Sequence, residues 1–484
     1  MDKEFFKNLT IKKVAKAMQD GDTTALELTQ YYLENIKGKN GELNAYLRIF
    51  AGAEDQARKI DEDIKNGKIM GPLAGIPFAI KDNMLIKGEV ASASSKILEN
   101  YRATYDATVI KKLREAGAIF LGTVNMDEFA MGSSTENSAF GPTKNPHDPA
   151  RVPGGSSGGS AVAVAADMAL ASLGSDTGGS IRQPASFCGE VGLKPTYGRV
   201  SRSGLIAMAS SLDQIGPITR TVEDAEIIFN IIKGKDPLDA TTVNEDVIPE
   251  TKQENKKLKI GLLTYDKNVV APEINDMMEK SVEMLKQAGH EIMEVTLPYL
   301  KYSLSCYYII MPAEVSSNLA RLDGVKYGLL KEGDNLLDDY LKTRGTGFGK
   351  EAKRRIMIGT YVLSSGYYDD YYSKAQEIRD LIRRDFENAF DLSAGGVDAI
   401  ILPTTTEPAF KIGEKTDDPM KMYLEDIFTV SANLAGVPAI SIPTGFAERD
   451  GVKLPLGLQI IAPHFREDVL FSLGKQVENA KIKV

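Results

Sequence analysis

The sequence predicts an α/β fold in which helices cover both faces of a large, mixed central β-sheet. Short apolar runs typical of buried strands occur at residues 76–80 and 118–121, with a helical pattern at 107–116 between them. Further runs of strand length lie at residues 260–263, 292–295, 399–402, 439–442 and 458–461. Because the strand runs are apolar throughout and alternate with helices, we expect a sheet that is buried on both faces.

Helical patterns occur at the start of the chain and again after its glycine-rich middle, residues 132–220. Residues 1–65 are expected to form helices, and Thr24 with Glu27 matches a capping box. Thr221 is expected to cap a later helix, and residues 466–480 to form the last one.

Two polar segments separate the strand-forming parts of the chain. Residues 240–257 are predicted to be an exposed connector. Residues 300–392 are helical and polar, with several tyrosines and arginines, and they interrupt the strand pattern. We expect a single domain over residues 1–484, in which residues 66–240 form the catalytic core. The insertion at 300–392 is expected to form a substrate cap or a partner surface.

The composition is that of an ordinary globular protein without disulfides. Of the 484 residues, 43% are hydrophobic and 26% are charged. The only cysteines, Cys188 and Cys306, fit a reducing compartment. No run of about 18 apolar residues occurs, and the N-terminal stretch lacks the apolar core of a signal peptide. We therefore expect a cytoplasmic protein that does not enter a membrane.

The balance of charge is acidic, with a formal net charge of −9. A protein that binds nucleic acid by itself usually presents a basic face, because neutralising phosphates drives that binding. If nucleic acid takes part in the function, we expect a partner to hold most of it.

One lysine stands at the end of a predicted buried strand. Lys81 follows residues 76–80 directly and should therefore lie at the edge of the sheet, where the functional sites of α/β folds are usually found. Burial there disfavours the ammonium form and lowers the pKa, as a lysine base requires. Most lysines lie on the surface, so this position alone is a weak signal.

Two further segments place serines beside paired glycines at predicted helix starts. Residues 153–160 contain Ser156, and residues 174–184 contain Ser180, 24 positions later. Glycines let a substrate approach the backbone, and free N–H groups at a helix start can stabilise an oxyanion. Each segment alone is equally typical of a tight turn with a capping serine. The two together, preceded by a strand-end lysine, form a specific combination.

At these residues the chain resembles the amidase signature family. Residues 154–160 and 174–184 match the family signature. Residues 188–201 and 211–217 are similar to those of the glutaminase subunits of tRNA-dependent amidotransferases. The resemblance covers nearly the whole chain and implies the amidase-signature fold.

The resemblance implies a Ser-Ser-Lys triad. Ser180 is then the nucleophile, Lys81 the base, and Ser156, on a cis peptide bond, the serine that passes the proton between them. This agrees with the chemistry, because a serine hydroxyl is a poor nucleophile until a base takes its proton. The expected oxyanion donors are four consecutive backbone N–H groups, those of Thr177, Gly178, Gly179 and Ser180. Losing one such donor typically costs about 3 kcal/mol of barrier.

The resemblance also implies free glutamine as the substrate. The subfamily binds glutamine with a tyrosine, an arginine and an aspartate, and the similar positions here are Tyr307, Arg355 and Asp426. A guanidinium suits the α-carboxylate of an amino acid, and a carboxylate suits its α-ammonium. The neighbours Arg354 and Tyr308 stay open as alternatives, and all of these could instead be surface residues.

Partners and cofactors follow from the same resemblance. It implies a heterotrimer with B and C subunits, a glutamine-hydrolysing, ATP-dependent carbon–nitrogen ligase. This complex converts Glu-tRNA(Gln) to Gln-tRNA(Gln) and, as an open extension, Asp-tRNA(Asn) to Asn-tRNA(Asn). We expect this chain to hydrolyse glutamine and supply ammonia without a cofactor, while a partner binds ATP and Mg²⁺ and most of the tRNA. The glycine-rich segments contain no G-x-x-x-x-G-K-[ST] phosphate loop.

Three other interpretations compete with this one. Residues 154–158 fit the G-x-S-x-G elbow of α/β-hydrolases, which needs a histidine later in the chain. Only His290 and His464 follow the serines, and we expect His290 to be structural and His464 to be exposed. A free-standing amidase of small amides is the alternative within the family. A non-catalytic scaffold is the alternative of another class, and the intact triad argues against it.

Overall fold

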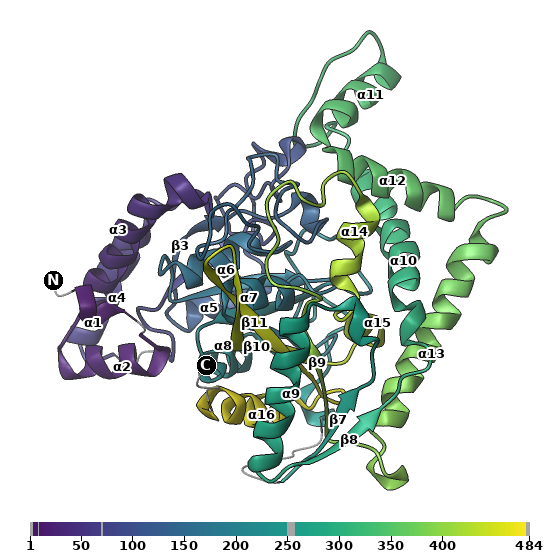
Figure 1. The fold of residues 1–484 in the computed structure, drawn as a ribbon. Helices are drawn as coiled ribbons and strands as arrows, with labels where there is room; N and C mark the ends of the chain where they lie inside the picture. Colours follow the sequence, from purple (N-terminus) through teal and green to yellow (C-terminus); the bar gives the residue numbers. More distant parts are fainter. Residues whose placement is uncertain (1–2, 8, 69–70, 249–256, 481–484) are drawn as a thin grey trace.

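Eleven strands form one mixed β-sheet in the computed structural model, which describes residues 3–7, 9–68, 71–248 and 257–480 (Figure 1). Their order across the sheet is β1-β3-β2-β4-β6-β5-β10-β11-β9-β7-β8. The strands are β1 Tyr46–Ile49, β2 Pro77–Lys81, β3 Ile119–Val124, β4 Ala171–Asp176, β5 Val191–Lys194, β6 Gln214–Thr219, β7 Lys259–Leu263, β8 Glu291–Val295, β9 Ala399–Pro403, β10 Ala439–Arg449 and β11 Val452–Ile461.

Helices connect the strands and extend beyond the sheet. The α-helices in the described part of the chain are α1 Lys3–Phe6, α2 Ile11–Asp20, α3 Ala25–Leu43, α4 Ala53–Lys65, α5 Thr108–Glu115, α6 Gly158–Ala165, α7 Arg182–Cys188, α8 Val222–Ile232, α9 Pro272–Gln287, α10 Ser303–Asn318, α11 Leu336–Gly347, α12 Lys350–Val362, α13 Lys374–Ala389, α14 Pro419–Tyr423, α15 Val430–Ala435 and α16 Glu467–Ala480. A π-helical segment, Tyr368–Ser373, leads into α13.

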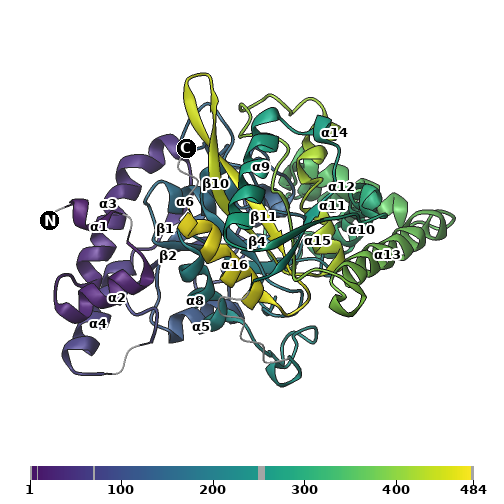
Figure 2. The same ribbon diagram turned by 60° about the horizontal axis from the view of Figure 1, so that its bottom comes forward.

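The helices cover both faces of the sheet (Figures 1 and 2). Gly457 of β11 lies against Ser186 of α7 and Ser441 of β10, whereas the next residue of β10, Ile442, lies against Gly474 of α16. Because consecutive side chains of a strand point to opposite faces, α7 and α16 lie on opposite sides of the sheet. Helix α6 contacts α7, and α8 and α9 contact α16. The expected α/β fold with helices on both faces is therefore confirmed.

Two parallel strands bring the glycine-rich segments to one edge of the sheet. β2 pairs in parallel with β4, in a register that matches Phe78 with Ala171 and Ile80 with Leu173. The carboxyl ends of parallel strands point the same way, so Lys81 at the end of β2 lies near Asp176 at the end of β4. The segment that follows β4 carries Ser180, and the sheet thereby gathers the expected catalytic residues.

Helices α10, α12 and α13 form a layer beside the sheet, on the right-hand side of Figure 1, and α11 projects at the top. α10 contacts both α12 and α13, and α13 contacts α15. α12 crosses α10 at Gly359, where a Cβ atom would lie 1.8 Å from the carbonyl oxygen of Pro312. Only glycine permits this crossing, which holds α12 close to the rest of the layer.

The structure departs from the sequence expectations mainly in its strands. β1 interrupts the helices expected over residues 1–65, and β5 and β6 lie inside the glycine-rich middle. β10 and β11 extend their apolar runs into a long hairpin. These strands contain polar or glycine residues, so they give no continuous apolar run.

Two expected helix caps are confirmed. The capping box of Thr24 and Glu27 is complete, and the hydroxyl of Thr221 accepts from the N–H of Asp224. Residues 249–256 of the expected connector, and the first two residues of the chain, lie outside the described residues. Within the described ranges, no helix has the length and apolar character needed to cross a membrane.

Candidate active site

Lys81 is fully buried among hydroxyl groups at the end of β2. Its Nζ lies 2.8 Å from Ser156 Oγ, 2.7 Å from Ser157 Oγ and 2.9 Å from Ser175 Oγ. The Ser157 hydroxyl donates to the carbonyl oxygen of Ser175 (3.1 Å), and Ser175 Oγ also accepts from Asn83 (3.0 Å). In the described structure Lys81 is the only hydrogen-bond partner of the Ser156 hydroxyl, which accepts from the amine here and can donate to it when the lysine is neutral.

The environment of Lys81 favours a neutral amine. Burial lowers the pKa of Lys81 to about 7, while the carboxylates of Asp127, Asp176 and Asp213 act in the opposite direction. None of these carboxylates forms a described hydrogen bond with the lysine, so desolvation outweighs their attraction. With this pKa, about half of the molecules carry a proton-free amine at neutral pH.

The backbone around Ser156 is held from two sides. The Gly155–Ser156 peptide bond is cis, and Ser156 is fully buried. The N–H of Gly155 donates to Gln183 of α7 (2.8 Å), and the carbonyl oxygen of Ser156 accepts from the N–H of Asp127 (3.2 Å). A Cβ atom on Gly155 would lie 2.2 Å from an Asp127 carboxylate oxygen, so only glycine fits there. These contacts direct the Ser156 hydroxyl toward Lys81.

Ser180 lies in the turn between β4 and α7 and is 8% exposed. Its carbonyl oxygen accepts from the N–H of Ser157 (3.2 Å), which joins the segments of the two expected catalytic serines. The structure thus joins Lys81 to Ser156 directly, and it describes no hydrogen bond between the Ser156 and Ser180 hydroxyls. Catalytic hydrogen bonds are often long in substrate-free enzymes and tighten when the substrate binds.

A buried ion pair shapes the turn that carries Ser180. Asp176 and Arg182 are fully buried and joined by two hydrogen bonds of 3.0 Å. Asp176 also accepts from the N–H of Gly179 (2.8 Å), and Arg182 donates to the side-chain oxygens of Asn433 and Gln459. Burial alone would raise the pKa of Asp176, but the charge and hydrogen bonds of Arg182 hold it well below its usual range.

The expected oxyanion donors are not equivalent. The N–H of Gly179 is engaged by Asp176, whereas no acceptor in the described chain engages the N–H groups of Gly178 and Ser180. The hydroxyl of Thr177 donates to a buried carboxylate at 2.7 Å, but no described acceptor engages its N–H. The N–H groups of Thr177, Gly178 and Ser180 are therefore the ones that the geometry leaves available for an oxyanion.

Asp426 and the two neighbouring tyrosines meet beside this turn. Asp426 accepts from the hydroxyls of Ser133 and Tyr308, each at 2.8 Å. Burial raises the pKa of Asp426 to about 6. Tyr307 packs against Gly178, where a Cβ atom would lie 2.7 Å from the tyrosine hydroxyl. Tyr307 thus faces the turn that carries Ser180, and Tyr308 orients Asp426.

Arg355 is buried in α12, whereas the side chain of Arg354 is 42% exposed. The guanidinium of Arg355 lies over the rings of Tyr308 and Tyr423, 5.4 Å and 5.6 Å from their centroids. Its Nε donates to Glu351 at 2.7 Å. Of the two neighbouring arginines, Arg355 is therefore the one that belongs to the cluster of Tyr308 and Asp426.

Several residues of this site were not assigned roles from the sequence. Asp176 and Arg182 lie within the motif at 174–184, where an acid and a base flanking the serine are a usable signal. Ser133 and Tyr423 come from separate segments and carry no local pattern, so only the fold brings them to the site. Glu351 lies four residues before Arg355, a helical ion-pair spacing that the sequence does show.

The histidines lie elsewhere. Nε2 of His147 and of His464 each contacts a backbone carbonyl oxygen at 3.0 Å. Nε2 of His290 lies 2.9 Å from the side-chain oxygen of Gln476. None of the three contacts a serine hydroxyl in the described structure, so the α/β-hydrolase mechanism has no histidine base here. His464 is half-buried rather than exposed.

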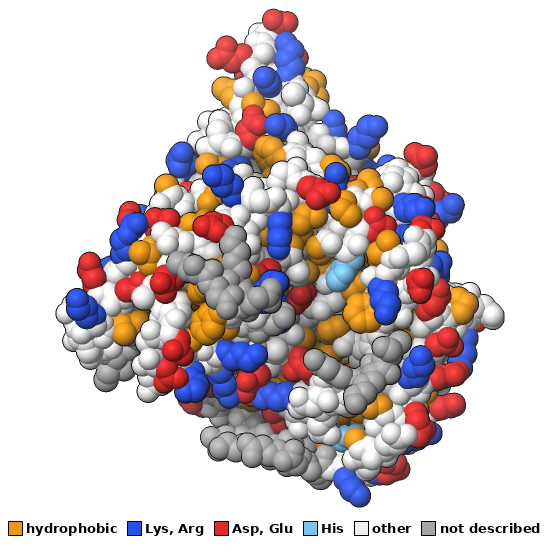
Figure 3. Space-filling model, turned by 60° about the vertical axis from the view of Figure 1, so that its left-hand side comes forward, with side chains coloured by type: hydrophobic (Ala, Val, Ile, Leu, Met, Phe, Trp, Pro, Cys, Tyr) orange, Lys and Arg blue, Asp and Glu red, His pale blue; other side chains and the backbone are white. Residues whose placement is uncertain are grey.

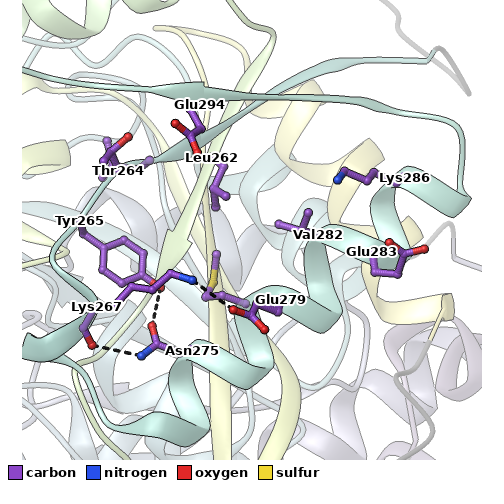
Figure 4. Close-up of a pocket in the computed structure, with 12 residues that line it drawn as sticks. Leu262, Thr264, Tyr265, Lys267, Asn275, Glu279, Val282, Glu283, Lys286 and Glu294 are labelled. Carbon is purple, nitrogen blue, oxygen red and sulfur yellow. Dashed lines mark hydrogen bonds and ion pairs between the residues drawn. The ribbon is translucent and has the colours of Figure 1, made fainter.

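A separate cavity of about 300 Å³ lies between α9 and strands β7 and β8 (Figure 4). Leu262, Tyr265 and Val282 form apolar parts of its wall, and Lys267 pairs with Glu279 at its edge. None of the expected catalytic or substrate residues lines it. Among the described residues, no group of three or more His, Cys, Asp and Glu side chains is placed to hold a metal ion.

The buried lysine beside two glycine-flanked serines, on a mixed sheet, is the arrangement expected of an amidase that uses a serine nucleophile. The chain belongs to the amidase family: the family model described as Amidase matches residues 27–471. It is 53% identical over 479 residues to the A subunit of the glutamyl-tRNA(Gln) amidotransferase of Koribacter versatilis (strain Ellin345), and the match covers 98% of both chains. The resemblance expected from the motifs is therefore confirmed.

Solved structures agree with this assignment. The A subunit of the glutamyl-tRNA(Gln) amidotransferase of Thermotoga maritima is 43% identical, with a TM-score of 0.79 over 98% of this chain and 95% of that one. The peptide amidase of Stenotrophomonas maltophilia is 30% identical, with a TM-score of 0.82 over 98% and 97%. The fold is thus that of amidase-family enzymes.

The pKa of Lys81 predicts how activity depends on pH. We expect kcat/KM for amide hydrolysis to rise with pH through about 7, because only the neutral amine accepts a proton and its fraction grows as pH increases. Lys81→Arg keeps a charge that does not titrate in this range, and should lower kcat/KM by about a thousandfold or more. Ammonia release, measured for the wild type and for Lys81→Arg at several pH values around 7, checks both expectations. A wild-type kcat/KM that does not change with pH would contradict the role of Lys81 as the base.

The buried ion pair predicts a loss of stability. Arg182→Met leaves Asp176 as a buried, unpaired charge and should lower the free energy of unfolding by about 3–5 kcal/mol. The double variant Asp176→Asn/Arg182→Met leaves no charge and should recover a large part of that loss. Arg383→Met, which breaks exposed pairs with Asp380 and Glu387, is the control and should change stability by less than about 1 kcal/mol. Urea unfolding measures the free energy of unfolding of all three variants. An equal loss of stability in Arg182→Met and in the double variant would argue against a stabilising role of the ion pair.

Proposed function

We propose that this chain is the glutaminase subunit of a tRNA-dependent amidotransferase. In this role it hydrolyses glutamine and supplies ammonia for converting Glu-tRNA(Gln) to Gln-tRNA(Gln). The observation that carries the proposal is the buried amine of Lys81 bonded to Ser156, in a chain more than 50% identical over nearly its full length to A subunits of such enzymes. Conversion of Asp-tRNA(Asn) stays an open extension of the same role.

The proposed reaction passes one proton along three groups. As Ser180 Oγ attacks the side-chain carbonyl carbon of glutamine, its proton moves to Ser156 Oγ, and the Ser156 proton moves to Lys81 Nζ. The tetrahedral oxyanion is held by N–H groups among those of Thr177, Gly178 and Ser180. Lys81 then returns the proton through Ser156 to the leaving nitrogen, and ammonia departs. Water hydrolyses the remaining glutamyl ester by the same proton path.

The charges of the site suit a free amino acid. Arg355 keeps its charge at every physiological pH and can pair with an α-carboxylate. Asp426, whose pKa is raised to about 6, is mostly ionised above neutral pH and can accept an α-ammonium. Tyr307 lies between this pair and the turn of Ser180, through its contact with Gly178. We assign these three residues to substrate binding, with Tyr308 orienting Asp426.

A free-standing amidase is the second candidate, because a peptide amidase shares the fold at 30% identity. The cluster of Arg355, Tyr308 and Asp426 favours glutamine over it, because its guanidinium and carboxylate match the two charges of an amino acid, which a simple neutral amide lacks. The higher identity to the amidotransferase subunits points the same way.

We infer that B and C subunits complete the enzyme in the cytoplasm and that ATP, Mg²⁺ and most of the tRNA bind to a partner. Acidic and basic side chains are interspersed on the face shown in Figure 3, which fits a chain of net charge −9 that does not hold tRNA alone. We keep a single domain over 1–484, with the core at 66–240, as part of this proposal.

Residues 300–392 offer a surface for a partner. About half of the large hydrophobic side chains that are exposed in the described chain lie between residues 325 and 371. They include Leu336, Leu337, Leu341, Met357 and Tyr361. Concentrated exposed apolar side chains are typical of interaction surfaces. This supports the partner role of the insertion, while its inner side, which carries Arg355, serves the substrate.

Glutamine turnover tests the proposal directly. The purified chain should release ammonia from glutamine, and a rapidly trapped sample should carry a glutamyl ester on Ser180. Ser180→Ala should lower kcat by about a thousandfold or more. Ser160→Ala removes a buried hydroxyl that donates to the backbone carbonyl oxygen of Leu173, and should stay active.

Three results would contradict the proposal. An ester on Ser156 would reverse the serine roles. Hydrolysis of small amides without hydrolysis of glutamine would favour the free-standing amidase. Complete transamidation by the isolated chain would remove the need for a partner.

A further inference from the structure

Glu128 is a buried carboxylate that the proposed chemistry does not use. It is 3% exposed and begins a short 3-10 turn, Glu128–Ala130. Its Oε2 accepts from the N–H of Gly349 (2.8 Å), and its Oε1 accepts from the hydroxyl of Ser95 (2.5 Å). Gly349 immediately precedes α12, so a side chain of the catalytic core caps a helix of the insertion.

Helix α12 needs this cap from elsewhere in the fold. The first N–H groups of a helix have no partner within the helix, and a side chain at the N-cap position usually supplies one. The N-cap residue of α12 is Gly349, which has no side chain to do so. A carboxylate is the group best suited to this end of the helix, because the helix dipole is positive there.

The capped end of α12 lies close to the expected substrate-binding arginine. Arg355 is six residues beyond Gly349, or about 9 Å along the helix axis. Arg355 is fixed by its bond to Glu351 in the first turn, and Glu351 in turn accepts from the hydroxyl of Tyr423 (3.1 Å). A shift at the start of α12 is therefore passed to the guanidinium of Arg355.

The residue before Glu128 serves the other half of the site. The N–H of Asp127 donates to the carbonyl oxygen of Ser156. Its carboxylate accepts from the N–H groups of Thr135 (2.8 Å) and Asn137 (3.0 Å) and so orders the loop that contains Ser133, the partner of Asp426. Two consecutive residues thus connect the Ser156 segment, the Asp426 contact and helix α12.

We propose that Glu128 is a positioning residue for substrate recognition, which sets the place of Arg355 relative to Ser180 by capping α12. This inference rests on the proposed function, because Arg355 is assigned there to the α-carboxylate of glutamine. Glu128 acts through the helix and does not itself touch the substrate.

Other contacts at the same junction keep the insertion attached when the cap is lost. The hydroxyl of Ser95 also lies 3.2 Å from the carbonyl oxygen of Gly347, and the rings of Phe129 and Phe348 lie 5.7 Å apart. Removing the carboxylate should therefore loosen the start of α12 without detaching it. Glu128→Gln can restore the cap, because its amide oxygen accepts from Gly349 while its NH₂ donates to Ser95.

The test compares three variants of the full-length chain. Glu128→Ala should raise KM for glutamine by about tenfold and change kcat by less than about threefold, while Glu128→Gln stays within about twofold of wild type. Glu99→Ala, which removes an exposed carboxylate paired with Lys96, is the matched control and should have no effect. A fluorophosphonate that labels Ser180 carries no amino-acid charges, so its labelling rate should be the same in all variants.

A second readout covers the helix itself. Amide hydrogen exchange at the start of α12 should be faster in Glu128→Ala and unchanged in Glu128→Gln. If Glu128→Ala does not fold, Glu128→Met removes both acceptor oxygens instead and keeps most of the side-chain volume. The same rise in KM is then expected.

Each remaining outcome is decisive. An unchanged KM in Glu128→Ala overturns the inference, and so does an equal loss of glutamine turnover and fluorophosphonate labelling. If wild-type protein labels normally but releases no ammonia from glutamine, the proposed function fails. Hydrogen exchange then still decides whether Glu128 holds α12.

Discussion

The site depends on keeping one amine proton-free inside the fold. Lys81 is enclosed by hydroxyl and carbonyl oxygens and forms no described ion pair, so burial outweighs three carboxylates that act from a greater distance. A direct ion pair would stabilise the ammonium form and remove the base. The hydroxyls of Ser157 and Ser175 can satisfy a neutral amine without adding charge, and in the proposed mechanism this allows Ser156 to pass its proton to Lys81.

Two sets of contacts hold the chain segments around that amine in place. The parallel pairing of β2 and β4 brings Lys81 next to the turn of Ser180, and the Asp176–Arg182 pair fixes the turn. The Asp127–Glu128 dipeptide connects the Ser156 segment to the helix of Arg355. The Asp176–Arg182 ion pair and the cap on α12 thereby hold the proposed catalytic residues on the sheet and the proposed substrate-binding arginine of the insertion in one geometry.

The sequence allowed the fold class, most strands and the three triad candidates to be predicted, because buried strands and glycine-flanked serines leave local patterns. It did not predict β1, an edge strand of mixed polarity, or β5 and β6, which lie among glycines. It left Arg354 and Arg355 equivalent, and only burial in α12 separates them. Ser133 and Glu128 act through partners 293 and 221 positions away, a distance at which no local pattern survives.

The protonation of Lys81 is the most direct test of this account. A nuclear magnetic resonance titration of isotope-labelled lysine side chains in the Ser180→Ala chain would follow the amine itself. Lys81→Arg would identify its signal, which is needed because burial also lowers the pKa of Lys194 to about 7. The account predicts a pKa of about 7 for Lys81. A value near the ordinary lysine pKa of about 10.4 would leave the amine charged at neutral pH and would contradict its role as the base.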